Sequence, residues 1–381
     1  YLRLIKDFNF YLSPRSVSFN TDIYRNFNTT KIRNISNPNM IIEPTFDKSF
    51  VWSRNFSIKY DLSRNLKIDF SSNNQASIDE PYGEIDTQEE KDIVFENLLH
   101  FGRPVNYNHT ISLNYNIPIN KFPLTDWVTV NTRYSANYNW DGAPLSLQTE
   151  DINLGNIIQN SSNKQINGQL NFNTLYNKIP YLKKLNQQNR PQRNIRGIDR
   201  NSNVIQNDTS KRAFKIKDHL LRLIFSPKNL SVSYVRNQGT MLPGYLPEPS
   251  FLGMDYSIMK PGLGFVLGSQ EDITPDYHDP KDNPWISTNT NLNSLYTKNS
   301  SENINLRGTI EPFKGFRIEL TGSRNFTNNL QEIFRYDTSS NFYNHYNPIQ
   351  NGSFSMSYFC INTSFLNNND EYVSEVFENF K

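Results

Sequence analysis

Hydrophobic and polar residues alternate with a period of two along much of this chain. The clearest segment is 105–117, whose odd positions are Val, Tyr, His, Ile, Leu, Tyr and Ile and whose even positions are Asn, Asn, Thr, Ser, Asn and Asn. Segments 50–62, 66–71 and 128–140 repeat the pattern, and only Arg54 interrupts the apolar side of 50–62. Such alternation is typical of β-strands with one apolar and one polar face.

Weaker alternation extends the prediction to about eleven strands and an all-β, antiparallel fold. The expected strands are 15–27, 50–62, 66–78, 105–117, 127–140, 164–176, 218–226, 230–238, 302–311, 316–326 and 353–361. Short turns follow the second, fourth, seventh and ninth of them. In an antiparallel sheet, the turns after even-numbered strands and those after odd-numbered strands lie at opposite ends. The predicted strands therefore place short turns at both ends, whereas barrels usually have them at one end.

Four other segments interrupt the strands. Residues 88–99 and 371–381 have helical patterns, 183–217 is basic and polar, and 239–285 is a long insert rich in Gly and Pro. No stretch approaches the ~18 apolar residues of a transmembrane helix. The sequence also lacks a repeat of 20–50 residues, which argues against a solenoid or a propeller.

Composition favours a membrane barrel over a soluble β-sandwich. Only 36% of the residues are hydrophobic, yet there are 26 Phe and 21 Tyr. A soluble sandwich usually exposes many Lys and Glu, whereas the polar positions here are mainly Asn, Ser and Thr. We therefore predict part of a very large transmembrane β-barrel with long loops and a few short helices. Aromatic residues near the strand ends would form interfacial girdles: Trp52, Tyr60, Tyr107, Tyr115, Tyr138 and Trp140.

Each predicted strand would then present one side to water and the other to lipid. The residues expected to face the lumen are Asn106, Asn108, Asn114, Asn131, Arg133 and Asn137. Those expected to face lipid are Trp52, Phe56, Ile58, Ile111, Leu113 and Tyr134. A charge on the lipid side costs roughly 2–4 kcal/mol at mid-bilayer. Arg25 and Arg54 should therefore lie near an interface or against packed protein.

Charge and chemistry exclude several classes of function. The net charge is +2, and the basic stretch lacks the interleaved aromatic residues of a single-strand groove, so we expect no nucleic acid. The single Cys360 excludes an internal disulfide. Asp276, His278 and Asp279 lie close together but lack the spacing of an EF-hand, which indicates a solvated loop. The chain has no catalytic motif, so we expect no enzyme, no metal and no cofactor.

The insert contains the residues that we expect to shape a pore or to bind a partner. They are Leu242, Pro243, Gly244, Tyr245, Leu246, Pro261, Gly262, Leu263, Gly264 and Phe265. The alternative is a packed structural loop in which Gly supplies turns. A dinucleotide fingerprint is excluded, because the third Gly and the following helix are missing.

Several short segments along the chain resemble, in the same order, segments of the SprA/Sov family of outer-membrane proteins. They include LIKDFNF at 4–10, DLSRNLKIDF at 61–70, FGRP at 101–104, LYNK at 175–178 and PGLGFVLGSQ at 261–270. None is a catalytic signature, but their number and order run over most of the chain. The resemblance implies that the chain is an internal fragment of a longer protein.

The resemblance implies a protein-conducting channel of the type IX secretion system in the outer membrane of Bacteroidetes-type bacteria. Such a channel exports folded cargo that carries C-terminal sorting domains, and it often supports gliding motility. The implied partners are this cargo, a lateral shuttle barrel, a plug protein, periplasmic accessory proteins and outer-membrane lipid. The alternatives are a large porin or nutrient-uptake barrel, and a β-rich surface adhesin.

Overall fold

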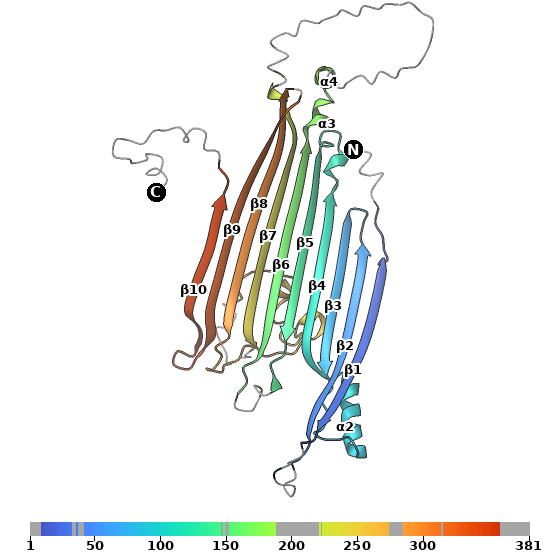
Figure 1. The fold of residues 1–381 in the computed structure, drawn as a ribbon, viewed down its shortest axis with the longest axis vertical. Coiled ribbons are helices and arrows are strands. Elements are labelled where there is room, and N and C mark those ends of the chain that lie inside the picture. The colour runs from blue at the N-terminus through green and yellow to red at the C-terminus, as the bar shows by residue number, and fades with distance from the viewer. Residues whose placement is uncertain are drawn as a thin grey trace, which may run out of the picture.

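A computed structural model gives the fold of the chain (Figure 1). It describes residues 9–32, 36, 42–145, 148, 152–187, 221, 223–273, 285–313 and 315–358. The predicted helix at 371–381, Cys360, the acidic loop around Asp276–Asp279 and most of the basic stretch lie outside these residues.

Ten long strands form one antiparallel sheet in which each strand pairs with the next along the chain (Figure 1). They are β1 (Ser16–Thr30), β2 (Thr45–Asp61), β3 (Leu66–Ser77), β4 (Arg103–Ile117), β5 (Val128–Asp141), β6 (Asn156–Asn171), β7 (Pro227–Tyr245), β8 (Leu295–Phe313), β9 (Phe316–Asp337) and β10 (Phe342–Met356). The all-β, antiparallel fold class is confirmed.

Short helices occur only in the connections. They are α2 (Gln88–Leu99), α3 (Phe172–Tyr176), α4 (Pro180–Gln187) and α6 (Leu263–Val266), with 3₁₀ turns η1 (Pro118–Lys121) and η3 (Phe251–Gly253). The helix predicted at 88–99 is confirmed. Thr87 and Glu90 form a capping box at its start, which satisfies two backbone N–H groups that the helix itself leaves unpaired.

One predicted strand is wrong, and the strands predicted at 164–176 and 353–361 are displaced from β6 and from β10. Of the range 218–226 the structure describes 221 and 223–226, which form no strand, because Phe225 and Ser226 donate backbone hydrogen bonds to Leu221 and Leu223 as in a helical turn. The strand expected at 164–176 is β6, which starts eight residues earlier and is followed by α3. The predicted strand at 230–238 is the middle of β7, which extends through the start of the predicted insert to Tyr245.

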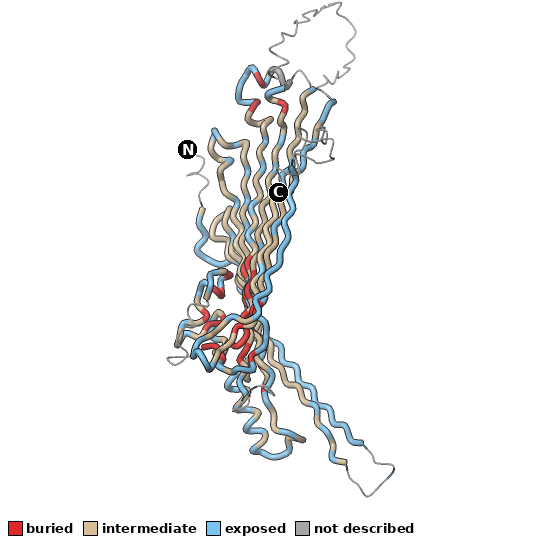
Figure 2. Tube along the Cα trace, turned by 90° about the vertical axis from the view of Figure 1, so that its left-hand side faces the viewer, coloured by how far each residue is buried: buried red, intermediate tan, exposed pale blue. Residues whose placement is uncertain are grey.

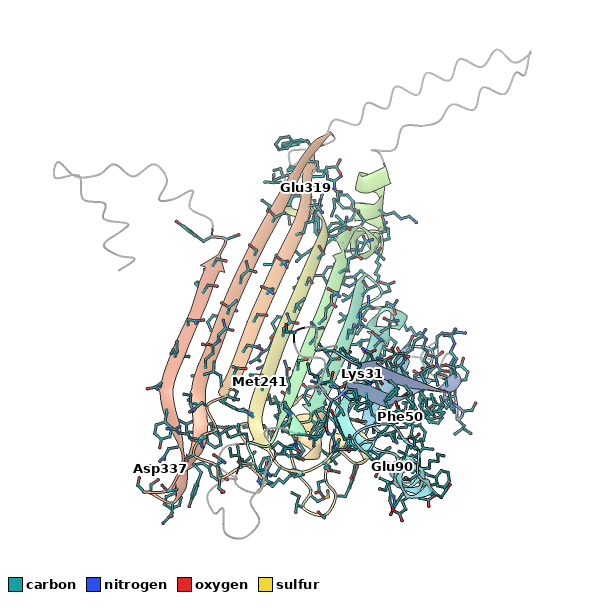
Figure 3. The ribbon with its side chains drawn as sticks, turned by 60° about the horizontal axis from the view of Figure 1, so that its bottom comes forward. Lys31, Phe50, Glu90, Met241, Glu319 and Asp337 are labelled. Carbon is teal, nitrogen blue, oxygen red and sulfur yellow. The ribbon has the colours of Figure 1, made fainter. Side chains whose placement is uncertain are left out.

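Short connections occur at both ends of the sheet. Those after β2, β4 and β8 lie at the upper end in Figure 1, and the four-residue connection between β9 and β10 lies at the lower end. The insert, defined here as residues 246–294 between β7 and β8, lies at the lower end with the α2 segment. Figure 3 marks the two ends of β9 by Glu319 and Asp337.

The register separates the side chains into two faces. One row of paired residues runs through Phe56, Ser72, His109, Tyr138, Asn160, Thr240, Lys298 and Leu330. We call the face that carries this row the apolar face and the opposite one the amide face. Paired residues share a face in an antiparallel sheet. The residues predicted to face the lumen are all on the amide face, and those predicted to face lipid are all on the apolar face.

The main buried cluster lies at the level of the insert, and a small separate group at the upper connection includes Tyr176 and Leu182 (Figure 2). To the main cluster the insert contributes Met254, Phe265, Val266, Trp285 and Ile286, which pack on aromatic and aliphatic side chains of β4–β9. Above the insert the strands are intermediate or exposed on both faces. The upper sheet therefore has no protein layer of its own among the described residues.

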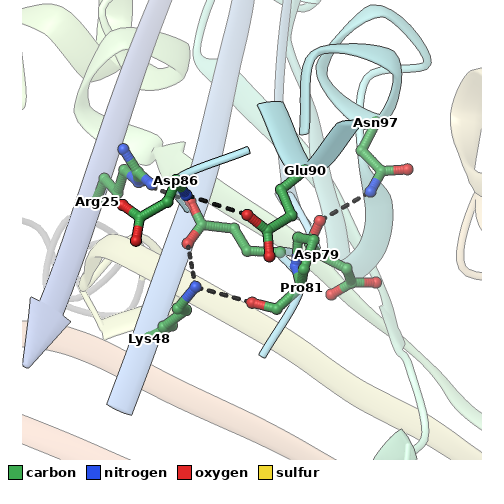
Figure 4. Close-up of polar contacts among 8 residues, drawn as sticks. Arg25, Lys48, Asp79, Pro81, Asp86, Glu90 and Asn97 are labelled. Carbon is green, nitrogen blue, oxygen red and sulfur yellow. Dashed lines mark hydrogen bonds and ion pairs between the residues drawn. The ribbon is translucent and has the colours of Figure 1, made fainter. Parts of the chain in front are cut away.

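Residues 78–102 cover the lower ends of β1–β4 and neutralise the cations there (Figure 4). The Glu80 side chain is 3% exposed and pairs with Arg25 at 2.6 Å and Lys48 at 3.7 Å. Lys48 also donates to the Pro81 carbonyl at 2.8 Å. The Arg25 side chain is 49% exposed, so it is paired with a buried carboxylate but is not itself packed within protein.

We expect Glu80→Gln to weaken the lower hairpin of β1 and β2, because it leaves the largely buried Lys48 without its carboxylate. Breaking such a pair costs about 2–4 kcal/mol, so amide protection in β1 and β2 should fall by at least tenfold. Hydrogen exchange of the full protein measures this. The exposed Glu84→Gln in the same segment is the control. Equal exchange in both variants would show that the pairing contributes nothing.

Candidate functional site

The amide face carries many Asn, Ser and Thr side chains that form hydrogen bonds between neighbouring strands. Thr110 donates to Asn137 at 2.7 Å, and Asn137 donates to Ser161 at 3.3 Å, which links β4, β5 and β6. Similar links join β6 to β7 and β8 through Asn163, Asn237 and Ser301. These groups offer hydrogen bonds to water with little charge, so the face is well hydrated and only weakly adhesive.

Hydrogen bonds of this kind occur at both edges of the sheet. Ser18 and Ser57 are 2.7 Å apart between β1 and β2, and Thr327 and Ser353 are 2.8 Å apart between β9 and β10. Among the residues predicted to face the lumen, Asn106 accepts a bond from Asn108 at 3.0 Å. One chemical surface therefore spans all ten strands.

The apolar face carries an uncharged band in its upper half. We define the apolar band as the alternate positions of 56–60 on β2, 66–70 on β3, 111–117 on β4, 128–134 on β5, 166–170 on β6, 230–234 on β7, 304–310 on β8 and 318–322 on β9. None is charged, and most are Ile, Leu, Val, Phe or Tyr. Ile166, Leu306 and Leu320 are 44–49% exposed. An exposed apolar surface of this breadth requires a covering.

A charged border limits the band on its lower side. On each of β2, β6, β7, β8 and β9, it is the charged residue of the apolar face that lies nearest to the band. These residues are Arg54, Lys164, Arg236, Glu302 and Arg324. Arg54 stacks on Trp52 and Phe101 with centroid distances of 5.3 and 5.4 Å and donates to Asn74. It therefore faces packed protein, as expected from the sequence.

The border crosses the strands obliquely. On β2 the border is at Arg54, two residues below the row of paired residues that contains Phe56. On β9 it is at Arg324, six residues above the same row. It thus rises by eight residues over seven strand steps. With about 3.3 Å per residue and about 4.8 Å between strands, the angle is about 40°.

The upper ends of the strands rise in the same direction. Asp61, at the end of β2, is five residues above the row, whereas Phe313, at the end of β8, is fifteen above it. Both limits of the band therefore tilt against the strands. Strands of transmembrane barrels tilt by about 35–45° relative to the barrel axis.

The insert is fixed to the lower apolar face by side chains of the sheet. His109 Nε2 lies 2.9 Å from the Val266 carbonyl, Tyr138 donates to Gly253 at 3.0 Å, and Trp140 donates to Pro247 at 3.1 Å. These contacts satisfy backbone carbonyls of an irregular segment that would otherwise be buried without partners.

Asn160 is the centre of this attachment. Its side chain is fully buried and donates to Phe265 at 2.9 Å and Ser269 at 2.8 Å. It also accepts from the Thr240 backbone at 3.2 Å and from Gln270 at 2.9 Å. All the hydrogen-bonding groups of this amide contact the insert or the adjacent strand, so it specifies one docked position.

The predicted partner residues of the insert divide into two groups. Leu242, Pro243, Gly244 and Tyr245 are part of β7 rather than a loop, and Leu242 and Tyr245 are fully buried. Phe265 is also buried, in the core. Leu263 is different, because its side chain is 50% exposed and keeps a free apolar surface.

Three of the aromatic residues assigned to a membrane girdle lie elsewhere. Tyr107, Tyr138 and Trp140 are at most 6% exposed and lie beneath the insert. Sequence reasoning missed their role, together with that of His109 and Asn160, because contacts with residues more than 100 positions away leave no local pattern.

No protein-family model matches this chain, and no match is found among curated proteins. In the part of the chain that the structure describes, no helix is both long and apolar enough to span a membrane. Those same residues contain no cluster of three or more metal-ligating His, Cys, Asp or Glu side chains.

We expect Asn160→Asp to release the insert, because a carboxylate of the same size cannot donate to Phe265 and Ser269. Burying these carbonyls without donors, next to a new charge, costs about 2–4 kcal/mol. Chymotrypsin should then cleave the insert at least tenfold faster, as followed by mass spectrometry. Asn163→Asp, on the amide face of the same strand, is the control. Unchanged cleavage in Asn160→Asp would contradict the proposed anchor.

Proposed function

We propose that this chain is a section of the wall of an outer-membrane, protein-conducting barrel of the SprA/Sov kind. The observation that carries the proposal is the oblique, uncharged apolar band opposite the amide face. A soluble sheet has no reason to tilt the limits of its apolar surface against its strands. A barrel wall must do so, because its strands are inclined while the bilayer is flat.

The dimensions of the band agree with this role. Three or four alternate positions per strand span five to seven residues, which is about 17–23 Å along the strand and about 13–18 Å along the bilayer normal at this tilt. Arg and Lys at the border can extend their apolar stems into the bilayer and add several ångströms. The total approaches the ~25 Å apolar belt of transmembrane barrels.

The amide face supports transport of large cargo rather than chemistry on a substrate. A wide pore for folded protein needs a hydrated wall without strong adhesive sites, and Asn, Ser and Thr supply one. Pairing within the described residues leaves β1 and β10 as the two edges of the sheet. A closed barrel that contained this sheet would need further strands between those edges.

Transmembrane barrels usually have short periplasmic turns and longer external loops. This wall has long connections at both ends: residues 172–226 between β6 and β7 at the upper end, and the insert at the lower end. The proposed partners are folded cargo with C-terminal sorting domains, a lateral shuttle barrel, a plug protein and periplasmic accessory proteins. No enzymatic activity is proposed.

A pair of adjacent substitutions tests the lipid-facing side. Leu113→Arg places a charge within the apolar band and should lower the free energy of unfolding in a bilayer by about 2–4 kcal/mol. Asn114→Arg, on the amide face, should change it by less than about 1 kcal/mol. Reversible unfolding of the full protein in lipid vesicles measures both values. Similar effects at the two positions would contradict a bilayer on the apolar face.

Conditional depletion of the full-length protein tests transport. A secreted cargo with a C-terminal sorting domain should then accumulate in the periplasm at its mature size, while unrelated outer-membrane barrels remain assembled. If cargo still reached the medium and only uptake of a nutrient fell, the barrel would be an importer, and the proposed secretion role would be wrong.

A further inference from the structure

A cavity opens on the apolar face where the upper rim of the insert meets the charged border. Its volume is about 530 Å³, and its lining includes Tyr134, Lys164 and Gln238 from the sheet and Leu267, Ser269 and Gln270 from the insert. Tyr134 donates to the Leu267 carbonyl, which joins the two sides. The apolar band begins directly above this cavity.

Lys164 is the cation that lines the sheet side of the cavity, and Arg236 lies beside it on the neighbouring strand, outside the lining. Lys164 lies over the Tyr134 ring at 6.0 Å, and its cross-strand partner is Arg236. Within the described residues, the buried Nε of Arg236 has no hydrogen-bond partner. The neighbouring Glu302 is paired with Arg324 at 2.6 Å, so it is already neutralised by another cation. Glu271, an exposed residue on the insert side of the lining, is the remaining carboxylate.

We propose that this cavity binds the phosphate-bearing headgroup of a membrane lipid. The inference rests on the membrane placement of the apolar band. A phosphate would accept hydrogen bonds from Lys164 and Arg236, while Gln238, Ser269 and Gln270 offer polar groups to the rest of the headgroup. The acyl chains would extend upward over the apolar band, past Ile166 and Tyr234. At this level of the sheet the charged border is followed directly by the apolar band, which suits a ligand with a charged headgroup and apolar chains.

The insert has a structural part in the site. It closes the lower side of the cavity, and it is held there by Asn160 and His109. Leu263 and Leu267 on α6 and its C-cap are 50% and 40% exposed, four residues apart. In this placement they lie at the level of the headgroups, where partly apolar segments are stable.

Lipid retention by the full-length protein tests the proposal. The protein is reconstituted in phosphatidylcholine nanodiscs that contain either phosphatidylglycerol or lipopolysaccharide, extracted into mild detergent, and analysed for bound lipid by native mass spectrometry. The variant Lys164→Gln/Arg236→Gln should bind the phosphate-bearing lipid about 30-fold more weakly, since each cation near an anionic surface contributes about fivefold. The control Lys67→Gln/Arg133→Gln removes the same charge from the amide face and should bind like the wild type.

The two lipids distinguish the source of the headgroup. Preferential retention of either one, or of both, over phosphatidylcholine supports a phosphate site, and it identifies a phospholipid or a glycolipid as the ligand. Equal retention by the wild type and the Lys164→Gln/Arg236→Gln variant would overturn the proposal. Leu113→Arg separates this failure from failure of the membrane placement, because its destabilisation in a bilayer does not depend on the headgroup.

Discussion

The antiparallel register is the constraint on which the other features of this protein depend. It holds alternate residues on the same face from β1 to β10, so a short pattern in each strand becomes a surface that spans the sheet. A shift of one residue in any pair would move Asn and Ser to the apolar face and Ile and Leu to the amide face. The Asn, Ser and Thr network opposes such a shift, because its side-chain hydrogen bonds form only in this register.

Local pattern was sufficient to predict the regular part of the fold. β2, β3, β4 and β5 match their predicted ranges within a few residues, and the prediction of α2 was correct because Thr87 and Glu90 mark its start. The start of β6 was missed, because residues 159–163 are polar on both faces and show no alternation. The false strand at 218–226 came from an apolar run that is too short to distinguish a helical turn from a strand.

The attachment of the insert could not be predicted from the sequence. Its contacts join Asn160 to Phe265 and Ser269, and His109 to Val266, across more than 100 residues. Tyr107, Tyr138 and Trp140 look the same in the sequence whether they face headgroups or a protein segment. The structure separates these cases, because burial beneath the insert leaves Trp140 only 2% exposed. The lower part of β4–β9 is therefore a platform for a loop, while the upper part of the same strands is not covered by it.

The antiparallel order of the strands has a consequence for how such a sheet can change in size. Because β2 and β3, β4 and β5, and β8 and β9 are each joined at the same end, the addition of one strand would reverse every connection beyond it, whereas the addition of two would not. The unit of growth is therefore a pair of strands. At a tilt of about 40°, each pair lengthens the circumference by about 12 Å. The bore of a barrel built in this way is set in discrete steps, by duplication or loss of hairpins.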